Sequence, residues 1–531
     1  MSLLLTAISP VDLGLPAKYQ AFRTAQAEAI DWIAQSDAQF LAASAATGTG
    51  KSLLGVAAAK ILGARAVYLT STRGLEDQIV TDFSPIGLKD VRGRANYRCS
   101  VYTGKFKRPT TCEQGMDEAC SLATTTGCPY ALAVQKANLS DLVATNYSYW
   151  LHARRSNENA LSVEKPVDIL ICDEAHSIFE ELARFLAVHF SRDELEFYAR
   201  NRRFALGESG LVDSDGWRDW AVRAQKQAAQ LLNQLKEKHG SVAAAKEEEP
   251  GTYEELENFR RKALAVSSMD DNWVWESTDY GVSFDVIWPG RYASMLWEGV
   301  PRVLFLSATL RPYMLHLVGL KKGDYEYQVF DNGWPANHAP VYYWPIAKLN
   351  YRSSDDDYRE VARAIDQIIE SRSDRKGIIQ TVSYARARTL LRFSRHAHKM
   401  FANDSSRDST ETARKFRNAK PPAVLISPSY QTGWDFAYDQ CEYQILVKVP
   451  WANSESRVVQ ERLKNESYRI STAAFEIVQI IGRARRAHDD RSETFILDKT
   501  FPLILVKGRQ YLPHTFNAHR IARLPNPPKK L

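Results

Sequence analysis

Short apolar runs recur along the chain and alternate with segments of helical periodicity. Gln39–Ser44 and Ala66–Thr70 have the pattern of buried strands, and Lys51–Leu62 between them has that of a helix. Further strand-like runs are Val167–Cys172, Arg302–Leu306, Gly377–Val382, Ala423–Ser427, Tyr443–Val449 and Thr494–Leu497. Strands that alternate with helices predict a parallel sheet. Two sets of such strands predict two α/β domains in series.

Two stretches interrupt this alternation within the first predicted domain. Residues 91–145 are rich in Arg, Lys, Thr, Gly and Cys with little periodicity, whereas Ser177 to about residue 283 is mostly helical in pattern. We expect both to be insertions. The composition, with 44% hydrophobic and 25% charged residues, is typical of a soluble globular protein, and no apolar run is long enough to span a membrane.

The charge and the cysteine content narrow the class of protein only slightly. A net charge of +6 permits nucleic-acid binding without requiring it. Six cysteines are too few for a secreted disulfide scaffold, and the start MSLLLTAISP lacks the basic residues of a signal peptide. We therefore expect a cytoplasmic protein.

The segment AATGTGKS, residues 45–52, lies between a predicted strand and a predicted helix. Its glycines allow backbone N–H groups to surround phosphate oxygens at a helix N-terminus. Lys51 would reach the β- and γ-phosphates of ATP, and the Ser52 hydroxyl would hold Mg²⁺. Ala45 stands where this motif usually has its first glycine, and a glycine-rich turn with an incidental lysine is the alternative. The expected ATP-binding residues are Ala46, Thr47, Gly48, Thr49, Gly50, Lys51 and Ser52, joined by Arg23 and Gln26 of the upstream FRTAQ segment, whose Gln amide could read an adenine edge. For FRTAQ the alternative is the start of a surface helix.

Two carboxylates, Asp173 and Glu174, directly follow the predicted strand Val167–Cys172. The carboxyl ends of parallel strands deliver side chains into the crevice where α/β proteins bind ligands. Asp173 would hold Mg²⁺ through its water shell, and Glu174 would accept a proton from the water that attacks the γ-phosphate. The alternative is an ordinary helix start that favours acidic residues.

Near the C-terminus, Gln479, Gly482, Arg483 and Arg486 are spaced at i, i+3, i+4 and i+7, so on a helix they share one face. Arg483 and Arg486 could act as arginine fingers on a γ-phosphate. A solvated basic helix face is the alternative.

Together these motifs resemble those of superfamily 2 helicases with DEAH boxes. Ser307-Ala308-Thr309 matches the family's SAT motif, residues 377–383 (GIIQTVS) resemble the opening motif of its second motor domain, and QIIGRARR at 479–486 resembles its final motif. The resemblance implies coupling roles for His176, Ser307, Thr309 and Gly433, nucleotide contact by Asp435, and catalytic roles for Lys51, Asp173, Glu174, Gln479, Arg483 and Arg486. Thr432 replaces the glutamate that relatives usually have before Gly433.

Four cysteines, Cys99, Cys112, Cys120 and Cys128, lie between the two nucleotide motifs. Four thiolates suit an iron–sulfur cluster or zinc, and plain core thiols are a third reading. The spacing has neither paired CxxC knuckles nor the ferredoxin run, so it does not choose among them. The flanking segments RGRANYRC (92–99) and VATNY (143–147) closely resemble the XPD/DinG iron–sulfur helicases. That resemblance implies a 4Fe-4S cluster.

The resemblance also implies a fold of two RecA-like parallel-sheet P-loop domains, with a cluster domain and a helical arch inserted in the first. The expected divisions are residues 1–90, 146–185 and 286–315 for the first RecA-like domain, 91–145 for the cluster domain, 186–285 for the arch, and 316–531 for the second RecA-like domain. Basic residues with an interleaved aromatic are typical of single-strand binding. The candidate DNA contacts are Arg94, Tyr97, Arg98, Lys105, Lys107 and Arg108, with a solvated basic surface as the alternative.

The implied activity is an ATP-dependent DNA helicase with 5′ to 3′ polarity that uses ATP, Mg²⁺ and the cluster. Single-stranded and forked DNA would be its partners, it would act as a monomer, and DNA repair is one of several compatible pathways. Two alternatives remain. One is an ATP-driven single-strand translocase or RNA/R-loop remodeller without processive unwinding. The other is a redox-responsive nucleic-acid-binding module with a vestigial motor.

Overall fold

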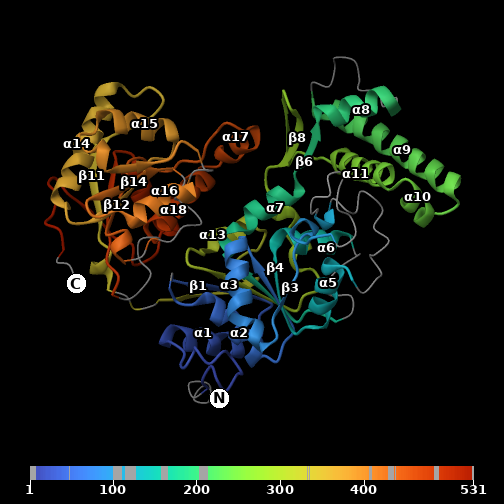
Figure 1. Cartoon of the computed structure of the whole chain (residues 1–531), viewed down its shortest axis with the longest axis horizontal. Coiled ribbons are helices and arrows are strands. Elements are labelled where there is room, and N and C mark those ends of the chain that lie inside the picture. The colour runs from blue at the N-terminus through green and yellow to red at the C-terminus, as the bar shows by residue number, and fades with distance from the viewer. Residues whose placement is uncertain are drawn as a thin grey trace. The chain divides into compact units, whose positions relative to one another are not determined.

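The computed structural model describes residues 8–46, 48–99, 111–113, 127–156, 165–202, 213–331, 333, 335–405, 409–428, 436, 438–482 and 489–528. The chain forms two compact units (Figure 1). The first comprises Met1–Ser44, Lys51–Gln328 and Ser454–Arg462, and the second Ala45–Gly50, Val329–Asn453 and Leu463–Leu531. Among the described helices, none has both the length and the apolar character that a membrane span requires.

A seven-stranded sheet with the order β10-β1-β9-β5-β2-β4-β3 is central to the first unit. Its strands are β1 (Phe40–Ala45), β2 (Ala66–Thr70), β3 (Lys89–Asp90), β4 (Leu142–Asn146), β5 (Ile169–Asp173), β9 (Arg302–Ser307) and β10 (Tyr325–Phe330). The pairings from β1 through β9, β5, β2 and β4 to β3 are all parallel. β1, β2 and β5 are buried along their whole length, as in a parallel sheet covered on both faces. The carboxyl ends of β1, β5 and β9 therefore meet at one edge.

The helices of the first unit alternate with the strands of its sheet. They are α1 (Thr24–Gln35), α2 (Lys51–Ile61), α3 (Arg73–Phe83), α5 (Pro129–Leu139), α6 (Tyr147–Ser156), α7 (Ile178–Leu186), α12 (Ser294–Trp297) and α13 (Pro312–Leu317). The predicted strand–helix–strand order from residue 39 to residue 70 is confirmed.

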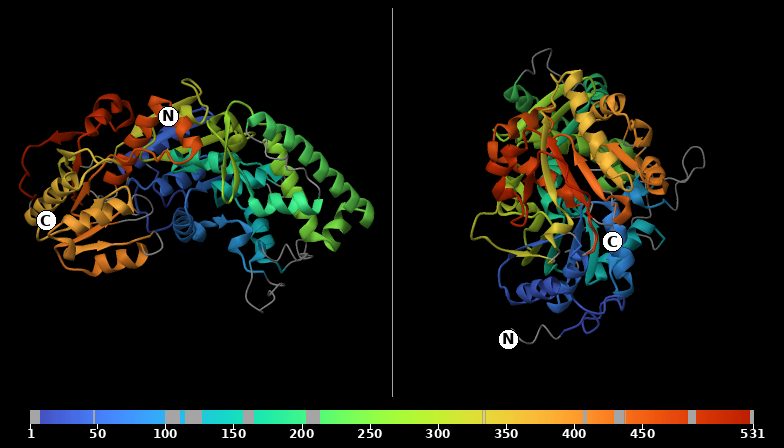
Figure 2. Two further views of the ribbon diagram at one scale, coloured as in Figure 1. Left: turned by 90° about the horizontal axis from the view of Figure 1, so that it is seen from above. Right: turned by 90° about the vertical axis from the view of Figure 1, so that its left-hand side faces the viewer.

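A helical subdomain lies between α7 and α12, and Figure 2 shows its two long helices side by side. Its helices are α8 (Arg192–Arg202), α9 (Ser214–His239), α10 (Val242–Glu248) and α11 (Pro250–Ser267). Phe190, Trp217, Trp220, Phe259 and Phe284 fill its core. The sequence pattern predicted mostly helix, and the structure adds an antiparallel sheet of β6 (Val188–Ser191), β8 (Gly281–Val286) and β7 (Trp273–Thr278). This sheet closes the base of the subdomain through Phe190 and Phe284.

The second unit also has a seven-stranded sheet, with the order β13-β14-β12-β15-β16-β11-β17, and each of its pairings is parallel. The strands are β11 (Val341–Ala347), β12 (Lys376–Gln380), β13 (Met400–Ala402), β14 (Ala423–Ser427), β15 (Tyr443–Leu446), β16 (Glu493–Asp498) and β17 (Ala518–Arg520). The helices are α14 (Asp355–Ser371), α15 (Tyr384–Phe393), α16 (Ser409–Asn418), α18 (Glu466–Gly482) and α19 (Phe501–Lys507). The prediction of two parallel-sheet α/β domains in series is thus confirmed.

Two close contacts stabilise the second sheet. Arg372, after α14, donates from Nε and Nη2 to the two carboxylate oxygens of Glu493 at 3.0 and 2.9 Å, and both side chains are at most 1% exposed. Gly377 lies so close to the Tyr443 ring that an added Cβ would be 2.2 Å from the nearest ring carbon. A side chain at position 377 would therefore require the Tyr443 ring to move.

A short helix, α17 (Arg457–Leu463), belongs to the first unit up to Arg462 although its sequence neighbours on both sides belong to the second. The Arg462 guanidinium is buried and donates to the carbonyl oxygens of Ile287 at 2.8 Å and Val286 at 2.9 Å. It also lies over the Phe179 ring and 3.5 Å from Glu180 Oε2 on α7. The chain therefore enters the first unit three times.

Candidate nucleotide site and cysteine insertion

The phosphate-loop sequence connects β1 to α2, as its pattern predicts. Gly48 and Gly50 have φ angles of 79° and 80°, a conformation that strains other residues. The Thr49 amide and hydroxyl both donate to Ala46 O, at 3.1 and 2.5 Å. Ala45 is the last residue of β1, where extended backbone accepts alanine, so the missing first glycine leaves the turn intact. Thr47 lies outside the described residues.

The acidic pair and the SAT segment lie at adjacent strand ends in the first unit. Asp173 ends β5, and β5 pairs in parallel with β9, which ends at Ser307. Glu174 has Lys51 Nζ 3.6 Å from Oε1 and His176 Nδ1 3.2 Å from Oε2. The same His176 nitrogen lies 2.9 Å from Ser307 Oγ. Lys51, Glu174, His176 and Ser307, which the sequence predicted separately, thus form one connected polar series.

The two carboxylates of this series have opposite electrostatic environments. Burial beside the charge of Glu174 raises the pKa of Asp173 above its usual value. Burial alone would raise the pKa of Glu174 too, but the attraction of Lys51 and the hydrogen bond with His176 outweigh it and lower that pKa. Glu174 also has a left-handed backbone, with φ 47° and ψ 46°, which is strained for a residue with a side chain. Lys51 and His176 therefore favour the ionised form of the Glu174 carboxylate.

Two buried tyrosines donate hydrogen bonds to Asp173, and sequence analysis missed both contacts. The Tyr68 hydroxyl, on β2, donates to Asp173 Oδ2 at 2.9 Å, while the Glu174 amide donates to Oδ1 at 2.8 Å. The Tyr147 hydroxyl donates to the main-chain oxygen of Asp173 at 2.8 Å. Gly55 on α2 leaves room for the Tyr68 ring, because a Cβ at this position would be 2.8 Å from it. Tyrosines within buried strands and helices carry no local signal of this role.

The SAT segment is joined to β1 by an arginine that sequence analysis also missed. Ser307 Oγ lies 3.3 Å from Thr309 Oγ1 and accepts from the Thr309 amide at 3.2 Å. Arg311 is 8% exposed and donates to Ser44 Oγ at 2.9 Å and to Tyr327 Oη at 3.2 Å. The residue before the phosphate loop and the SAT segment are thereby tied together.

The structure describes three of the remaining residues that were predicted to contact the nucleotide, namely Arg23, Gln26 and Gln479. Gln26 is buried near the start of α1, and its Oε1 accepts from the amide of the exposed Arg23 at 2.9 Å, so this oxygen caps the helix. Gln479 is half-buried on α18. The other predicted residues of the second unit, Gly433, Asp435, Arg483 and Arg486, lie outside the described residues.

Three of the four predicted cluster ligands are described. The Cys112 amide donates to Tyr97 O at 2.7 Å, and Cys99 follows Tyr97 by two residues. Cys128 is the N-cap of α5, and the Tyr130 ring beyond it packs edge-on against the Tyr97 ring at 5.5 Å. All three cysteines thus lie next to one packed aromatic pair. In the part of the chain that the structure describes, no three His, Cys, Asp or Glu side chains are gathered as a metal site. Cys120 lies outside that part.

Charged contacts connect Arg92, upstream of these cysteines, to α3 and β3. Arg92 Nε lies 3.3 Å from Glu76 Oε1 on α3 and 3.0 Å from Asp90 Oδ2, and its Nη2 lies 2.6 Å from Asp77 Oδ1. The Arg92 amide donates to the Tyr97 hydroxyl at 3.0 Å. Burial raises the pKa of the Glu76 carboxyl to about 7 although Arg92 opposes this.

Of the predicted DNA contacts, Arg94 lies over the Tyr130 ring at 4.7 Å and Tyr97 packs as described above, whereas Arg98 is exposed. Lys105, Lys107 and Arg108 lie outside the described residues. Tyr147, Tyr149 and Trp150, which follow the cysteine-containing segment in the sequence, are buried.

Comparison with known proteins matches a part of each unit to a family model. Residues 20–204 match the family model of the res subunit of type III restriction enzymes, and residues 367–513 match the helicase C-terminal domain. The chain is 26% identical over 229 residues to the ATP-dependent DNA helicase DinG of Salmonella choleraesuis (strain SC-B67) and to that of Salmonella typhimurium (strain LT2). The match covers 39% of this chain and only 32% of the length of each relative.

Solved structures agree over nearly the whole chain. A structure titled XPD helicase gives a TM-score of 0.61 at 16% identity and covers 94% of this chain and 99% of its own. The structure of Xpd4 from S. tokodaii gives 0.59 at 16% identity, covering 94% of this chain and all of its own. The helicase C-terminal family model and the DinG relatives thus show sequence similarity to helicases over parts of the chain, and the XPD structures share its fold.

Proposed function

We propose that this protein is an ATP-dependent DNA helicase that moves 5′ to 3′ along single-stranded DNA and separates duplexes. The observation that carries the proposal is the polar series from Lys51 through Glu174 and His176 to Ser307. It links a phosphate-binding lysine to the SAT segment through one carboxylate and one imidazole. A change at the γ-phosphate would therefore alter hydrogen bonds as far as Ser307.

Each residue near the nucleotide has a role that follows from its chemistry. The phosphate-loop amides and Lys51 would bind the phosphates of ATP, and Ser52 and Asp173 would hold Mg²⁺, which neutralises charge at the β–γ bridge. The ionised Glu174 orients the attacking water and accepts its proton as the water oxygen bonds to the γ-phosphorus and the bond to ADP breaks. The proposed contacts from the second unit are Gln479, Arg483, Arg486 and Asp435, with coupling by Gly433.

The proposed organisation follows the family resemblance. Residues 91–145 would carry the cluster and residues 186–285 the arch, on a RecA-like domain completed by residues 1–90, 146–185 and 286–315, with residues 316–531 as the second. Single-stranded and forked DNA would contact the exposed Arg98 and the neighbouring basic residues. We propose that the protein acts as a monomer in the cytoplasm.

A 4Fe-4S cluster held by Cys99, Cys112, Cys120 and Cys128 is the proposed cofactor of the insertion. The three described cysteines adjoin one packed group, and thiolates are the ligands that such a cluster requires. Bound there, the cluster would staple a polar segment too short to build its own core. Cys112→Ser should remove the visible absorbance of the anaerobically purified protein and abolish unwinding while ATP binding remains. Cys441→Ala, which alters a buried thiol of the second unit, should change neither property.

The test of the activity is strand displacement with ATP and Mg²⁺ on duplexes with either a 5′ or a 3′ single-stranded tail. We expect the wild type to unwind the duplex with the 5′ tail alone and Lys51→Ala to unwind neither duplex. Ser307→Ala should lower the unwinding rate about tenfold and leave the ATPase rate nearly normal, because one buried hydrogen bond couples ATP hydrolysis to unwinding. Unwinding from the 3′ tail alone would refute the polarity. DNA-stimulated ATPase without displacement would indicate a translocase, and stimulation by RNA alone an RNA remodeller. If the protein turned over no ATP under any condition, it would be a nucleic-acid-binding module and not a helicase.

A further inference from the structure

A surface pocket of about 410 Å³ lies at the amino-terminal ends of β3 and β4. Because the strands are parallel, this is the sheet edge opposite the one where β1 and β5 lead into the nucleotide motifs. The lining residues are Lys60, Ile86, Gly87, Lys89, Lys136, Leu139, Ser140, Asp141 and Leu142. The proposed ATPase reaction uses none of them.

The pocket combines positive charge with an apolar side chain. Lys60 from α2, Lys89 from β3 and Lys136 from α5 converge on it, and within the described chain none of the three ammonium groups makes a hydrogen bond or an ion pair. The one acidic lining residue, Asp141, is already paired with Lys165. Leu139 is 69% exposed at the end of α5. The pocket therefore combines a net positive charge with an exposed apolar side chain, which complements a ligand that carries carboxylates and an apolar group.

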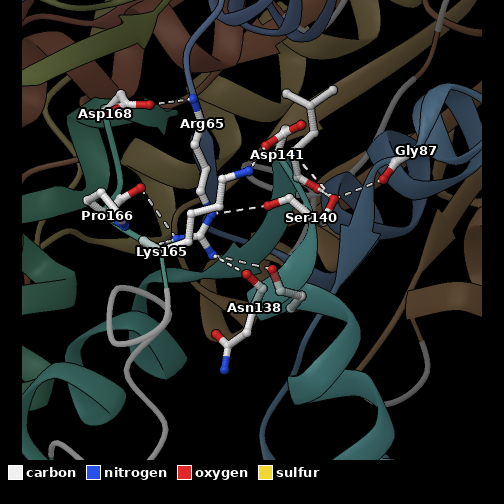
Figure 3. Close-up of polar contacts among 10 residues, drawn as sticks. Arg65, Gly87, Asn138, Ser140, Asp141, Lys165, Pro166 and Asp168 are labelled. Atoms are coloured by element: carbon white, nitrogen blue, oxygen red, sulfur yellow. Dashed lines mark hydrogen bonds and ion pairs between the residues drawn. The ribbon is translucent and has the colours of Figure 1, made fainter.

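A buried arginine, Arg65, binds backbone oxygens beside the pocket (Figure 3). Arg65 is 2% exposed and donates to the carbonyl oxygens of Asn138 at 3.2 Å and Ser140 at 3.1 Å, at the end of α5. The Ser140 hydroxyl donates to Gly87 O at 3.0 Å on the opposite wall. A pocket held this way needs no rearrangement to bind, which lowers the entropic cost of association.

We propose that this pocket is a docking site for an acidic peptide segment of a partner protein, with an apolar side chain seated against Leu139. Carboxylates of the peptide complement the three lysines, and one apolar side chain fits the volume. Nucleic acid is the less suitable occupant, because the lining offers no aromatic ring for base stacking and exposes an aliphatic side chain to the ligand. The proposal is independent of the helicase assignment.

Fluorescence anisotropy of labelled peptides with the full-length protein at low ionic strength tests this site. The probe is a heptapeptide of aspartates with a central leucine, compared with versions in which serine replaces the leucine or asparagine replaces the aspartates. We expect Lys136→Glu to weaken binding about tenfold and Leu139→Ser about fivefold. Both residues are exposed, so the variants should fold, and their ATPase should remain normal. Lys226→Glu, a matched reversal on the exposed surface of α9, should leave peptide binding unchanged.

We expect the pocket variants to bind the leucine peptide more weakly than the wild type does, and the wild type to bind both altered peptides more weakly than the leucine peptide. Equal binding by wild type and Lys136→Glu overturns the proposal, as does the absence of binding by the leucine peptide. If inorganic phosphate displaces the peptide at equal concentration, the pocket is a simple anion site. If an oligothymidylate loses affinity for Lys136→Glu instead, the surface contacts nucleic acid. Each of these two results also rejects a peptide-docking role.

Discussion

Tyr68→Phe removes one hydroxyl from the centre of the first unit and leaves the aromatic ring in place. That hydroxyl donates to Asp173 Oδ2 at 2.9 Å, and both side chains are 2% exposed. Because both side chains are buried, solvent water cannot replace this hydrogen bond unless the surrounding residues rearrange. After the substitution, the carboxylate retains the Glu174 amide at 2.8 Å and is free to rotate away from the position proposed for Mg²⁺.

The magnitude follows from the charge and burial of this bond. A hydrogen bond to an ionised group contributes about 1.5–3 kcal/mol. Each 1.36 kcal/mol of lost transition-state stabilisation lowers a rate about tenfold, so full expression in catalysis would lower kcat about 10- to 150-fold. Part of the loss will instead lower the free energy of unfolding. We therefore expect a fall of about tenfold in kcat together with a higher Mg²⁺ concentration for half-maximal activity.

DNA-stimulated ATPase measured across Mg²⁺ concentrations at saturating ATP separates these contributions. Tyr147→Phe is the matched control, because it deletes a buried hydroxyl that donates to the main chain of Asp173 at 2.8 Å. It should lower thermal stability without changing the Mg²⁺ dependence. If both variants lose equal stability and both keep wild-type kcat and Mg²⁺ dependence, Tyr68 does not position the carboxylate and the reasoning is refuted.

Three further substitutions test the packing around the two sheets. Burial raises the pKa of the Glu76 carboxyl from 4.5 to about 7, so the folded state binds a proton at this carboxyl more tightly than the unfolded chain does. The free energy of unfolding of the wild type should therefore fall by at most about 3 kcal/mol as the pH rises from 4.5 to about 7. Glu76→Gln should flatten this dependence in urea unfolding at about pH 5 and pH 8, and an unchanged slope would contradict it. Glu493→Gln leaves Arg372 buried without its counter-charge and should lower the free energy of unfolding by about 3–5 kcal/mol, and a loss below about 1 kcal/mol would show that the pair is not desolvated. Gly377→Ala would bring a Cβ within 2.2 Å of the Tyr443 ring and should cost about 1–3 kcal/mol in the same denaturation assay, with an unchanged midpoint as the contrary result.

The parts of the fold predicted from sequence are those with a local signature. The runs Ala66–Thr70 and Ala423–Ser427 coincide with β2 and β14, because fully buried parallel strands are continuous apolar stretches. The short edge strands β3, β13 and β17 have two or three residues each and escaped prediction. β7 and β8 also escaped it, because they lie within a stretch that is mostly helical.

The residues of the candidate site also differ in whether a local sequence signal predicts them. Lys51 and Glu174 could be proposed from sequence because each belongs to a local motif after a buried strand, a glycine-rich loop for Lys51 and an acidic pair for Glu174. Tyr68, Arg311 and Arg65 were not, because each acts on a partner that is distant in sequence: the phenol of Tyr68 contacts a carboxylate 105 positions away. A residue of ordinary type in an ordinary strand gains its role only from the neighbours that the tertiary fold supplies.

The return of α17 to the first unit determines how the protein can be divided experimentally. A fragment that stops before residue 454 loses Arg462 and leaves the main-chain oxygens of Val286 and Ile287 without the guanidinium that they share. In such a fragment the first unit would lack one of its three chain segments. A synthetic peptide of residues 454–463, added to such a fragment, should restore the hydrogen bonds of Arg462 to Val286 and Ile287. The first unit is therefore suited to fragment complementation.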